Sequence, residues 1–466
     1  MNTIPVEVYG VLAYLLLCAG IAILTRRTRS FSEFSVGGRQ VPAAMIFASV
    51  ATTYIGPGFS VGFIGKGFAT GYTFYLLALT YAVQTILVGL FFAPRLAQFR
   101  DCYTIGDVME RRYGKAAQLL SGIISVGLCV GFTAIMGKIA GQLLHTVTGL
   151  PLSVSIAAVT MFTAVYTFTG GVRAVIANDG IQFLAFTVII PFLLLLAFFK
   201  SPVSAAEVAA QAADLTRSGL TGLTGIQILG IALAFLLGET LTPPYANRAL
   251  AAKSAAESRQ GFVIAGVFCV IWLGICATLG VFARQFLPAD TMADNALLAI
   301  GQQLLPAAVY GILLAAVVAI VMSSQESVLN SASVSLVKDI IGIRGNLNDR
   351  TELILSRIAT LALAATAVIV AQYAPSIIEG LLICYSIWAP GLLLPFLLGL
   401  YVKRTKPMAG WLSMLVGAAT SIIWQTVLKE PGGIPAILVG LAASGLGYII
   451  GQMFGPANTI REGDAS

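Results

Sequence analysis

A run of polar residues lies near the end of a long apolar segment that covers residues 305–337. On a helix, which turns by about 100° per residue, these side chains share one face and leave Val328, Leu329 and Ala332 on the other. Hydroxyl and carboxylate oxygens suit a small hard cation, whereas zinc or copper would need His and Cys. We therefore expect a cation to bind along this face. The alternative is that the serines only bond their own backbone or pack against neighbouring helices. The polar residues are Ser323, Ser324, Glu326, Ser327, Asn330 and Ser331.

A second feature is a break in the apolar segment 41–65, which carries Gly56-Pro57-Gly58 near its centre. Proline removes a backbone donor and clashes with the preceding turn, and glycine costs about 1 kcal/mol relative to alanine in a helix. The segment should therefore form two half-helices with an unwound joint. Non-helical backbone at bilayer depth persists only where protein buries it or where it lines a polar cavity. The free carbonyl groups of the joint thus predict a bound cation or a polar solute.

Residues 225–247 repeat this pattern, because Gly238, Glu239 and Thr242-Pro243-Pro244 interrupt an otherwise apolar segment. Two interrupted segments in corresponding positions of two halves mark the central site of a transporter. The alternative is that glycine and proline only kink these helices. Because both breaks also carry polar side chains, we favour the binding site.

The rest of the chain supplies the membrane helices that would hold these features. It is 58% hydrophobic and 10% charged, with a mean hydropathy of +0.91, and apolar runs of about twenty residues recur along it. We predict an all-α polytopic membrane protein in which spans 2–6 and 7–11 form two inverted five-helix repeats, each with a broken first helix. The predicted units are residues 1–40 (first span and loop), 41–200 (first repeat), 201–402 (second repeat) and 403–466 (two further spans and a short tail). The thirteen predicted spans cover residues 5–25, 41–65, 71–94, 117–146, 151–169, 178–200, 225–247, 260–284, 305–337, 353–373, 376–401, 408–428 and 433–454.

Basic residues concentrate in alternate loops, and the positive-inside rule then places the amino terminus outside and the carboxyl terminus in the cytoplasm. The inner loops receive most of the 27 basic residues, among them Arg95, Arg248 and Lys338. The net charge of +7 follows from this topology, so it gives no reason to expect nucleic-acid binding. The predicted location is the plasma or inner membrane, where the protein would function as a monomer.

The sequence lacks the motifs of a membrane enzyme. Its six cysteines are scattered without a paired spacing, and neither an HExxH zinc motif nor a nucleophile elbow occurs. We therefore do not expect an enzyme, and an integral membrane enzyme is a remote alternative. A passive channel would need rings of charge or a filter loop, and two broken helices argue against it.

Two charged residues lie inside predicted spans: Lys138 in span 4 and Glu239 at the second break. A charge within the bilayer costs about 2.5–3.5 kcal/mol, so a partner or a function is expected. We expect a solute site in which Lys138 holds a carboxylate and Glu239 or Tyr54 meets another polar group. The alternative is a structural ion pair of Lys138 with Glu239 or Glu326. The complete predicted solute lining is Tyr54, Gly56, Pro57, Gly58, Gln84, Lys138, Gln142, Glu239 and Thr242.

Four local patterns occur in order along spans 2–12. They are Gly37-Gly38-Arg39 before the first break; Thr169-Gly170-Gly171-Val172-Arg173-Ala174-Val175 followed by Asp179 and Gln182; Arg248-Ala249-Leu250-Ala251-Ala252-Lys253 after the second break; and Met322-Ser323-Ser324 with Ser331-Ala332-Ser333 and Asp339. Together they resemble the sodium:solute symporter family, which has the leucine-transporter-like inverted-repeat fold. Each pattern alone is weak, but their common order makes the resemblance specific.

The resemblance implies a sodium ion between the broken second span and the ninth span. Its ligands would be the backbone carbonyls of Thr52, Ile55 and Ile320 and the hydroxyls of Ser323 and Ser324.

Some members of this family have a second cation site, which would correspond here to Asp179, Ser323, Glu326 and Ser327. A hydroxyl is expected at the position of Glu326. The carboxylate there could strengthen cation binding, hold a proton, or pair with a cationic side chain.

The expected function is sodium-coupled import of a small polar organic solute by alternating access, with an organic acid or amino acid favoured because of Lys138. The alternative is a proton-coupled symporter of the same fold that uses Glu326 or Asp179. Na+ is the coupling ion, and the other partners are the solute and the lipid bilayer. Similar family members handle amino acids, sugars, vitamins and monocarboxylates, and the residues predicted to face the solute do not select one of these.

Overall fold

The computed structural model describes residues 30–345, 347–373, 377–402 and 404–455, together with residues 9–11, 13, 14, 16 and 20. The predicted first span, residues 5–25, falls mostly outside the described residues, as do Lys403 and the tail 456–466. The described chain is helical, apart from one isolated bridge between Val41 and Ala252. Its helices are α2 (Phe31–Val36), α3 (Ala43–Tyr54), α4 (Phe63–Thr70), α5 (Thr73–Leu87), α6 (Ala93–Leu96), α7 (Ile105–Tyr113), α8 (Lys115–Thr148), α9 (Leu152–Phe199), α10 (Ala205–Thr221), α11 (Gly225–Leu237), α12 (Pro243–Ala251), α13 (Ala255–Ala283), α14 (Ala296–Leu304), α15 (Ala307–Ser335), α16 (Asp349–Ala371), α17 (Ile377–Trp388), α18 (Leu394–Tyr401), α19 (Pro407–Ile422) and α20 (Ala436–Phe454).

Nine helical segments in these described ranges are long and apolar enough to cross a membrane. They coincide with predicted spans 3, 4, 6 and 8–13, so those predictions are confirmed. Predicted span 5 is present as a shorter apolar helix, Leu152–Phe168. The protein is therefore an all-helical polytopic membrane protein.

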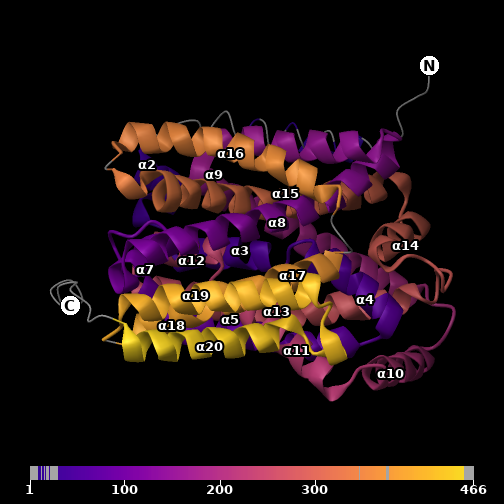
Figure 1. The fold of residues 1–466 in the computed structure, drawn as a ribbon. Coiled ribbons are helices and arrows are strands. Elements are labelled where there is room, and N and C mark those ends of the chain that lie inside the picture. Colours follow the sequence, from indigo (N-terminus) through magenta and orange to yellow (C-terminus); the bar gives the residue numbers. More distant parts are fainter. Residues whose placement is uncertain are drawn as a thin grey trace.

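Both predicted helix breaks are present. α3 and the segment Gly58–Thr70 meet at an angle of 57°, and α11 ends at Leu237, six residues before α12 begins at Pro243. α3 lies inside the bundle and is seen between α8 and α17 in Figure 1. Both joints follow from prolines, which cannot supply the backbone N–H that a continuous helix requires.

Spans 5 and 6 are joined by a sharp kink rather than by a loop. Gly171 has φ 61° and ψ −166° within α9, a conformation that is open to glycine and costly for other residues. A Cβ atom at this position would lie 2.7 Å from the Cα atom of Phe34. The glycine therefore permits both the bend and the close approach of α2 to α9.

Two amphipathic helices between spans were not predicted. α10 lies at the edge of the bundle (Figure 1), and α7 leads into α8. Each begins with a reciprocal capping box, formed by Ser204 with Glu207 and by Thr104 with Asp107. Such caps satisfy free N–H groups at a helix start. A search for long apolar runs passes over helices of this kind, although the capping residues are visible in the sequence.

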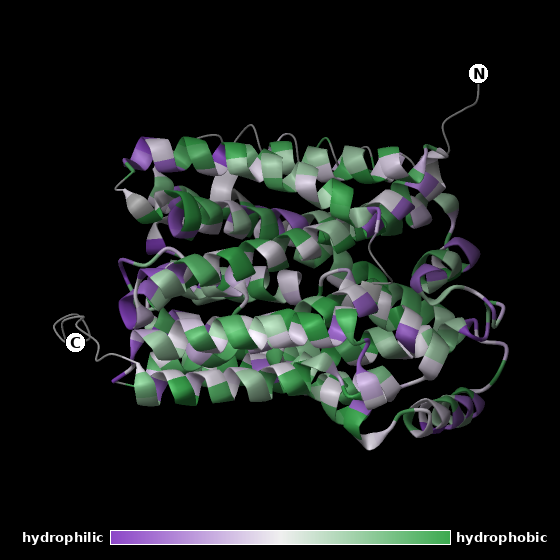
Figure 2. Cartoon of the chain, viewed as in Figure 1, coloured by the Kyte–Doolittle hydropathy of each residue, from purple (hydrophilic) through white to green (hydrophobic). Residues whose placement is uncertain are grey.

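α15 packs against α8, α9 and α16. Residues 316–335 are all buried, including the whole polar stripe. Figure 2 shows hydrophobic residues along the outer helices α16, α19 and α20 and hydrophilic residues mainly at the ends of the bundle. The polar stripe thus faces protein on every side, as a membrane protein requires of side chains that cannot face lipid.

Candidate functional site

The first break is the stretch Ile55–Gly58. The N–H of Ile55 still donates to the Ala51 carbonyl at 2.8 Å and that of Gly56 to the Thr53 carbonyl at 3.2 Å, but Pro57 has no N–H to continue the series. The chain then resumes as a π-helical turn, Gly58–Gly62. A break of this kind brings backbone oxygens to the interior without helical partners.

The break is fixed in place from the side of α13. The Ser60 hydroxyl donates to the Ile55 carbonyl at 2.5 Å and accepts the indole N–H of Trp272 at 2.9 Å. A carbonyl oxygen has two lone pairs, so Ile55 retains one acceptor position. This predicted sodium ligand is therefore held in position and still able to bind a cation.

Ser324 of α15 lies directly against the break. A Cβ atom placed on Gly56 would lie 2.8 Å from Ser324 Oγ and 2.9 Å from the Thr53 carbonyl oxygen. Ser324 is fully buried, and its hydroxyl has no hydrogen-bond partner in the described structure. Ile320, one turn earlier on the same helix, is also fully buried. A buried hydroxyl without a partner costs about 1–3 kcal/mol, and this oxygen is available to a ligand at the break.

Ser323, the neighbouring serine, bonds a carboxylate instead. Its hydroxyl donates to Asp179 Oδ1 at 2.5 Å, while the Ser49 hydroxyl donates to Asp179 Oδ2 at 2.5 Å. Thr52 Oγ1 lies 3.1 Å from the backbone oxygen of Asp179. The structure thus brings α3, α9 and α15 together around this aspartate.

Arg248 completes the same group, which we call the Arg248 cluster: Arg248, Asp179, Ser49 and Ser327. The arginine is 1% exposed. Its Nη2 lies 2.5 Å from Ser327 Oγ and 3.6 Å from Asp179 Oδ2, and its Nε donates to Ser49 Oγ at 3.0 Å. Nη1 donates to the Pro244 carbonyl at 3.0 Å.

The expectation that Arg248 lies in an inner loop is therefore wrong. The residue follows the second break by only one helical turn, and α12 carries it into the interior, where Asp179 compensates its charge. A guanidinium thus stands among residues that the sequence assigned to a second cation site.

Glu326 lies beside this cluster and is fully buried. Its Oε1 accepts from the amide of Asn178 at 3.1 Å, and its Oε2 has no hydrogen-bond partner in the described part of the chain. The described contacts of Glu326 therefore do not support its proposed ion pair with Lys138.

The second break carries its own buried carboxylate. Glu239 is 6% exposed. The hydroxyls of Tyr81 and Tyr385 donate to its Oε2 at 2.5 and 2.8 Å, and that of Tyr245 donates to its Oε1 at 3.0 Å. The described hydrogen bonds of Glu239 thus come from tyrosines, which argues against the alternative ion pair with Lys138.

The backbone beside Glu239 is unusual. Leu241 is fully buried with φ 49°, a left-handed conformation that side chains other than glycine, asparagine and aspartate rarely adopt. Strained backbone of this kind is concentrated at ligand sites and moving segments. The Thr240 carbonyl accepts the indole N–H of Trp388 at 3.1 Å, which anchors the break to α17.

The two breaks meet through aromatic rings. Tyr54, at the end of α3, stacks on Tyr245 of α12 with ring centroids 4.1 Å apart and meets Tyr81 edge-on at 4.9 Å. Phe59 stacks on Tyr81 at 4.0 Å. We call Tyr54, Tyr81, Tyr245 and Tyr385 around Glu239 the tyrosine cage.

Three predicted solute-lining residues around the cage have unused polar atoms. Gln84 Nε2 and Thr242 Oγ1 are buried without a hydrogen-bond partner among the described residues. The Tyr54 hydroxyl faces Thr85 and Gln84 but makes no hydrogen bond within the usual limits of distance and angle. Polar atoms this deep are normally bonded, so the cage is also suited to a polar ligand.

Lys138 and Gln142 lie on α8 and are only half-buried. The contacts described above join Tyr54, Gln84, Glu239 and Thr242 to the two breaks, and they do not extend to these two residues. Their role in solute binding stays a prediction.

Sequence reasoning missed the three tyrosines that bond Glu239 and the buried position of Arg248. Tyr81, Tyr245 and Tyr385 come from α5, α12 and α17, and nothing in their separate surroundings links them. The one available indication was the carboxylate itself, because a buried Glu239 must have donors nearby.

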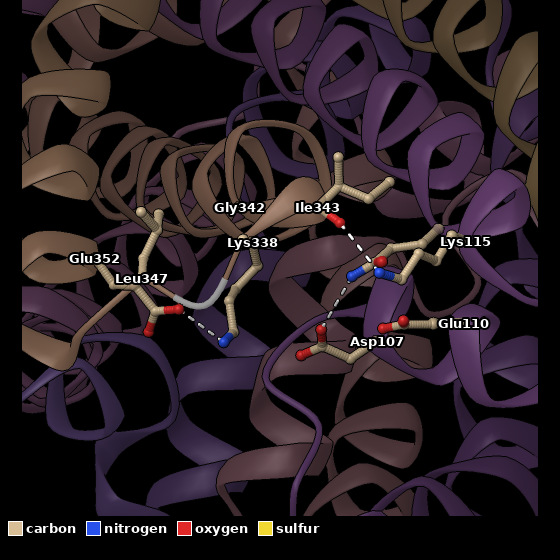
Figure 3. A pocket seen from close by; sticks show the side chains of 10 residues that line it. Asp107, Glu110, Lys115, Lys338, Gly342, Ile343, Leu347 and Glu352 are labelled. Atoms are coloured by element: carbon tan, nitrogen blue, oxygen red, sulfur yellow. Dashed lines mark hydrogen bonds and ion pairs between the residues drawn. The ribbon is translucent and has the colours of Figure 1, made fainter.

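A separate pocket of about 440 Å³ lies near one end of α15 (Figure 3). Lys338 forms an ion pair with Glu352 at 2.9 Å, and the Gln118 amide donates to Asp107 Oδ1 at 3.4 Å. Burial raises the pKa of the Asp107 carboxyl. The pocket joins α7, α8 and α16 to the end of α15, and it shares no residue with either break. Its lining is Asp107, Glu110, Lys115, Gln118, Lys338, Gly342, Ile343, Gly345, Leu347 and Glu352.

Comparison with known proteins places these features in a family context. The model of the sodium:solute symporter family matches residues 34–417. The chain is 27% identical to the sodium/pantothenate symporter of Escherichia coli (strain K12), covering 95% of both chains. It is 26% identical to the sodium/glucose cotransporter of Vibrio parahaemolyticus, covering 92% of this chain and 86% of that protein. It is also 26% identical to the high-affinity proline transporter PutP of Bacillus subtilis (strain 168), over 86% and 88% of the two chains.

Solved structures show the same fold. A Na+-coupled sialic acid symporter in a substrate-bound outward-open state aligns with a TM-score of 0.85 at 17% identity, covering 98% of this chain and 99% of that one. A nucleobase-cation-symport-1 family transporter in a closed conformation aligns with a TM-score of 0.56 at 13% identity, over 93% and 98% of the two chains. These similarities establish the leucine-transporter-like architecture of the bundle.

Proposed function

Because the chain belongs to the sodium:solute symporter family, we propose that it imports a small polar organic solute together with one sodium ion bound between the first break and α15. Family membership makes the protein a sodium-coupled solute symporter in the membrane, not an enzyme. The nature of the solute, the sodium ligands and the stoichiometry are the proposal.

The buried hydroxyl of Ser324, without a partner and against Gly56, is the observation that carries the sodium site. The proposed ligands are Ser324 Oγ, Ser323 Oγ and the backbone oxygens of Thr52, Ile55 and Ile320. An all-oxygen set with no carboxylate in direct contact suits a monovalent ion that must also be released. Asp179 stands behind Ser323 at 2.5 Å, where it favours positive charge.

The Arg248 cluster supports a stoichiometry of one sodium ion. The second predicted cation site was Asp179, Ser323, Glu326 and Ser327, and in the structure a guanidinium nitrogen lies 2.5 Å from Ser327 and 3.6 Å from Asp179. A second cation there would add positive charge beside a fixed one at low dielectric. Arg248 therefore takes the part of that cation, and sodium binds at the first break alone.

Sodium at the first break would couple the two halves of the molecule. It would join the broken end of α3 to α15 and so favour the conformation that accepts solute from outside. One monovalent ion moving inward across about 100 mV releases about 2.3 kcal/mol, which supports roughly fifty-fold accumulation of a neutral solute. The repeats 41–200 and 201–402 would move around the site, in the plasma or inner membrane, with the amino terminus outside and the carboxyl terminus in the cytoplasm. Each monomer would act by itself.

The test is uptake by reconstituted vesicles from a panel of labelled solutes, with an inward sodium gradient compared with an equal potassium gradient. Wild-type protein should accumulate a solute only with sodium, and the double substitution Ser323→Ala, Ser324→Ala should abolish that dependence. Ser333→Ala is the matched control, because this buried serine of the same helix donates to its own backbone at Asn330. Equal sodium dependence in the double variant and the control would refute the proposed site.

A further inference from the structure

We infer that the transported solute carries a positively charged nitrogen, which binds between the Glu239 carboxylate and the rings of Tyr54 and Tyr245. This inference rests on the proposed function and specifies its solute. It replaces the preference for an organic acid, which depended on Lys138 alone.

The first argument is charge. Glu239 is buried at the second break, and the hydrogen bonds that the structure describes for it come from three neutral hydroxyls. Phenolic donors stabilise a carboxylate without neutralising it, and a buried anion favours a cation nearby. A solute anion would be repelled by Glu239, whereas a cationic solute would complete its electrostatic environment.

The second argument is the unused lone pair. A carboxylate has about four acceptor positions, and its two oxygens here accept three hydroxyls. Oε2 accepts from Tyr81 and Tyr385, and Oε1 accepts only from Tyr245. One acceptor position on Oε1 is thus available to an ammonium N–H.

The third argument is the aromatic surroundings. Tyr245 donates to the carboxylate at 3.0 Å, and Tyr54 stacks face to face on Tyr245 with ring centroids 4.1 Å apart. Aromatic faces attract ammonium groups, by about 2 kcal/mol when the pair is desolvated. A carboxylate together with several aromatic faces therefore recognises an amine better than a sugar hydroxyl or a carboxylic acid.

Two other polar atoms without partners indicate which second polar group the solute carries. Gln84 Nε2 is a donor and Thr242 Oγ1 can donate or accept, and both are buried without partners in the described structure. A carboxylate, carbonyl or hydroxyl group of the solute would supply the polar partner that these two atoms lack. An amino acid or an amino alcohol has this combination.

Binding also requires the two breaks to separate. A ring spacing of 4.1 Å leaves no room between Tyr54 and Tyr245, and these residues belong to α3 and α12, one from each repeat. An ammonium group that enters between the rings would exchange a contact between the repeats for contacts with the solute. The cage thus links solute binding to the relative movement of the repeats.

The experiment is a thermal-shift and uptake screen with matched pairs of solutes, each amine compared with its N-acetyl derivative. The panel holds amino acids, amino alcohols and quaternary ammonium compounds, with sugars and carboxylic acids as further controls. Potassium replaces sodium in the reference buffer, because choline or another organic cation could itself occupy the cage. We expect stabilisation and uptake in sodium for at least one amine, and at least a tenfold weaker effect of its acetylated partner.

Variants then test the residues. Glu239→Gln should raise the half-maximal concentration of the amine at least tenfold, while the thermal shift by sodium alone stays as in wild type. Tyr245→Phe keeps the ring face and should have a smaller effect than Tyr245→Leu. The sodium shift also reports whether each variant is folded.

The outcomes separate the two claims. If sodium fails to stabilise the wild-type protein or to drive uptake, the proposed function fails. If sodium acts but the preferred solutes are neutral or anionic, or if no amine in the panel stabilises the protein, this inference alone is overturned. The same holds if Glu239→Gln leaves amine binding unchanged.

Discussion

The Arg248 cluster and the first break both contact α15, through Ser327 and Ser324, but they differ in how their polar groups are satisfied. In the cluster, Arg248 bonds Ser49, Ser327 and Pro244 and lies 3.6 Å from Asp179. At the break, Ser324 is equally buried, yet its hydroxyl has no partner among the described residues. The polar groups around Arg248 have partners within the protein, whereas the Ser324 hydroxyl is available to a ligand. A charge supplied by the chain cannot leave, and for this reason we propose the first break as the sodium site.

The largest effect is expected from Arg248→Met, which removes the fixed positive charge of the Arg248 cluster. Loss of one partner from a buried ion pair typically costs about 3–5 kcal/mol, because the other charge stays buried without compensation. We expect a clear fall in melting temperature in detergent. Adding Asp179→Asn should recover much of the loss, and a single variant as stable as wild type would contradict the structural role of the cluster.

The same variant tests whether the protein binds one sodium ion or two. If the guanidinium takes the place of a second cation, then Arg248→Met should allow a second sodium ion to bind near Asp179. Sodium titrations followed by intrinsic fluorescence should then change from a simple to a cooperative curve. An unchanged single-site curve in a folded Arg248→Met protein would count against this part of the account.

A change in the proposed sodium site should weaken sodium binding and leave the free energy of unfolding of the sodium-free protein nearly unchanged. Ser324→Ala removes one ligand and also a hydroxyl that is buried without a partner, so the sodium-free protein should be as stable as wild type or slightly more stable. The half-saturating sodium concentration should rise at least tenfold, which corresponds to about 1.4 kcal/mol of binding free energy. Ser324→Thr, which keeps the hydroxyl, is the control, and its sodium affinity should stay closer to wild type.

Gly56→Ala should have a smaller effect on the same ligand. The added methyl group would lie 2.8 Å from Ser324 Oγ and 2.9 Å from the Thr53 carbonyl oxygen, so one of these groups must move. We expect a few-fold rise in the half-saturating sodium concentration and a stability loss of about 1–3 kcal/mol. Gly127→Ala is the matched control, because a methyl group there meets nothing within 4 Å. Similar sodium affinities for the two variants would mean that Gly56 and Ser324 are not part of one site.

The smallest change is expected for Glu326→Gln. The glutamine oxygen can still accept from Asn178, as Glu326 Oε1 does at 3.1 Å, and the proposed sodium ligands do not include this side chain. Sodium-driven uptake should keep its ion requirement and its sodium stoichiometry. A change in either would make Glu326 part of the coupling site.

The sequence was sufficient for the features that depend on local physics. Prolines and glycines locate both breaks, apolar length locates the spans, and helical periodicity places Ser323 and Ser324 on a common face with Glu326. Those features depend on neighbouring residues, and the structure confirms both breaks and spans 3, 4, 6 and 8–13. The short capped helices α7 and α10 were missed because they contain no long apolar run.

The parts that could not be predicted depend on residues distant in the chain. Arg248 was placed in a loop because basic residues usually flank spans, and only the folded bundle brings it to Asp179. The tyrosines that bond Glu239 come from three different helices. Conversely, Lys138 attracted interest as a charge within an apolar segment, although in the structure its side chain is half-buried.

The most direct test of the central claim is equilibrium binding of radioactive sodium to the purified protein, measured without solute. The account predicts that one sodium ion binds saturably to each wild-type chain and that Ser324→Thr binds sodium nearly as well. At the sodium concentration that half-saturates the wild-type protein, Ser324→Ala should bind almost no sodium. Equal binding by Ser324→Ala and wild type would contradict it.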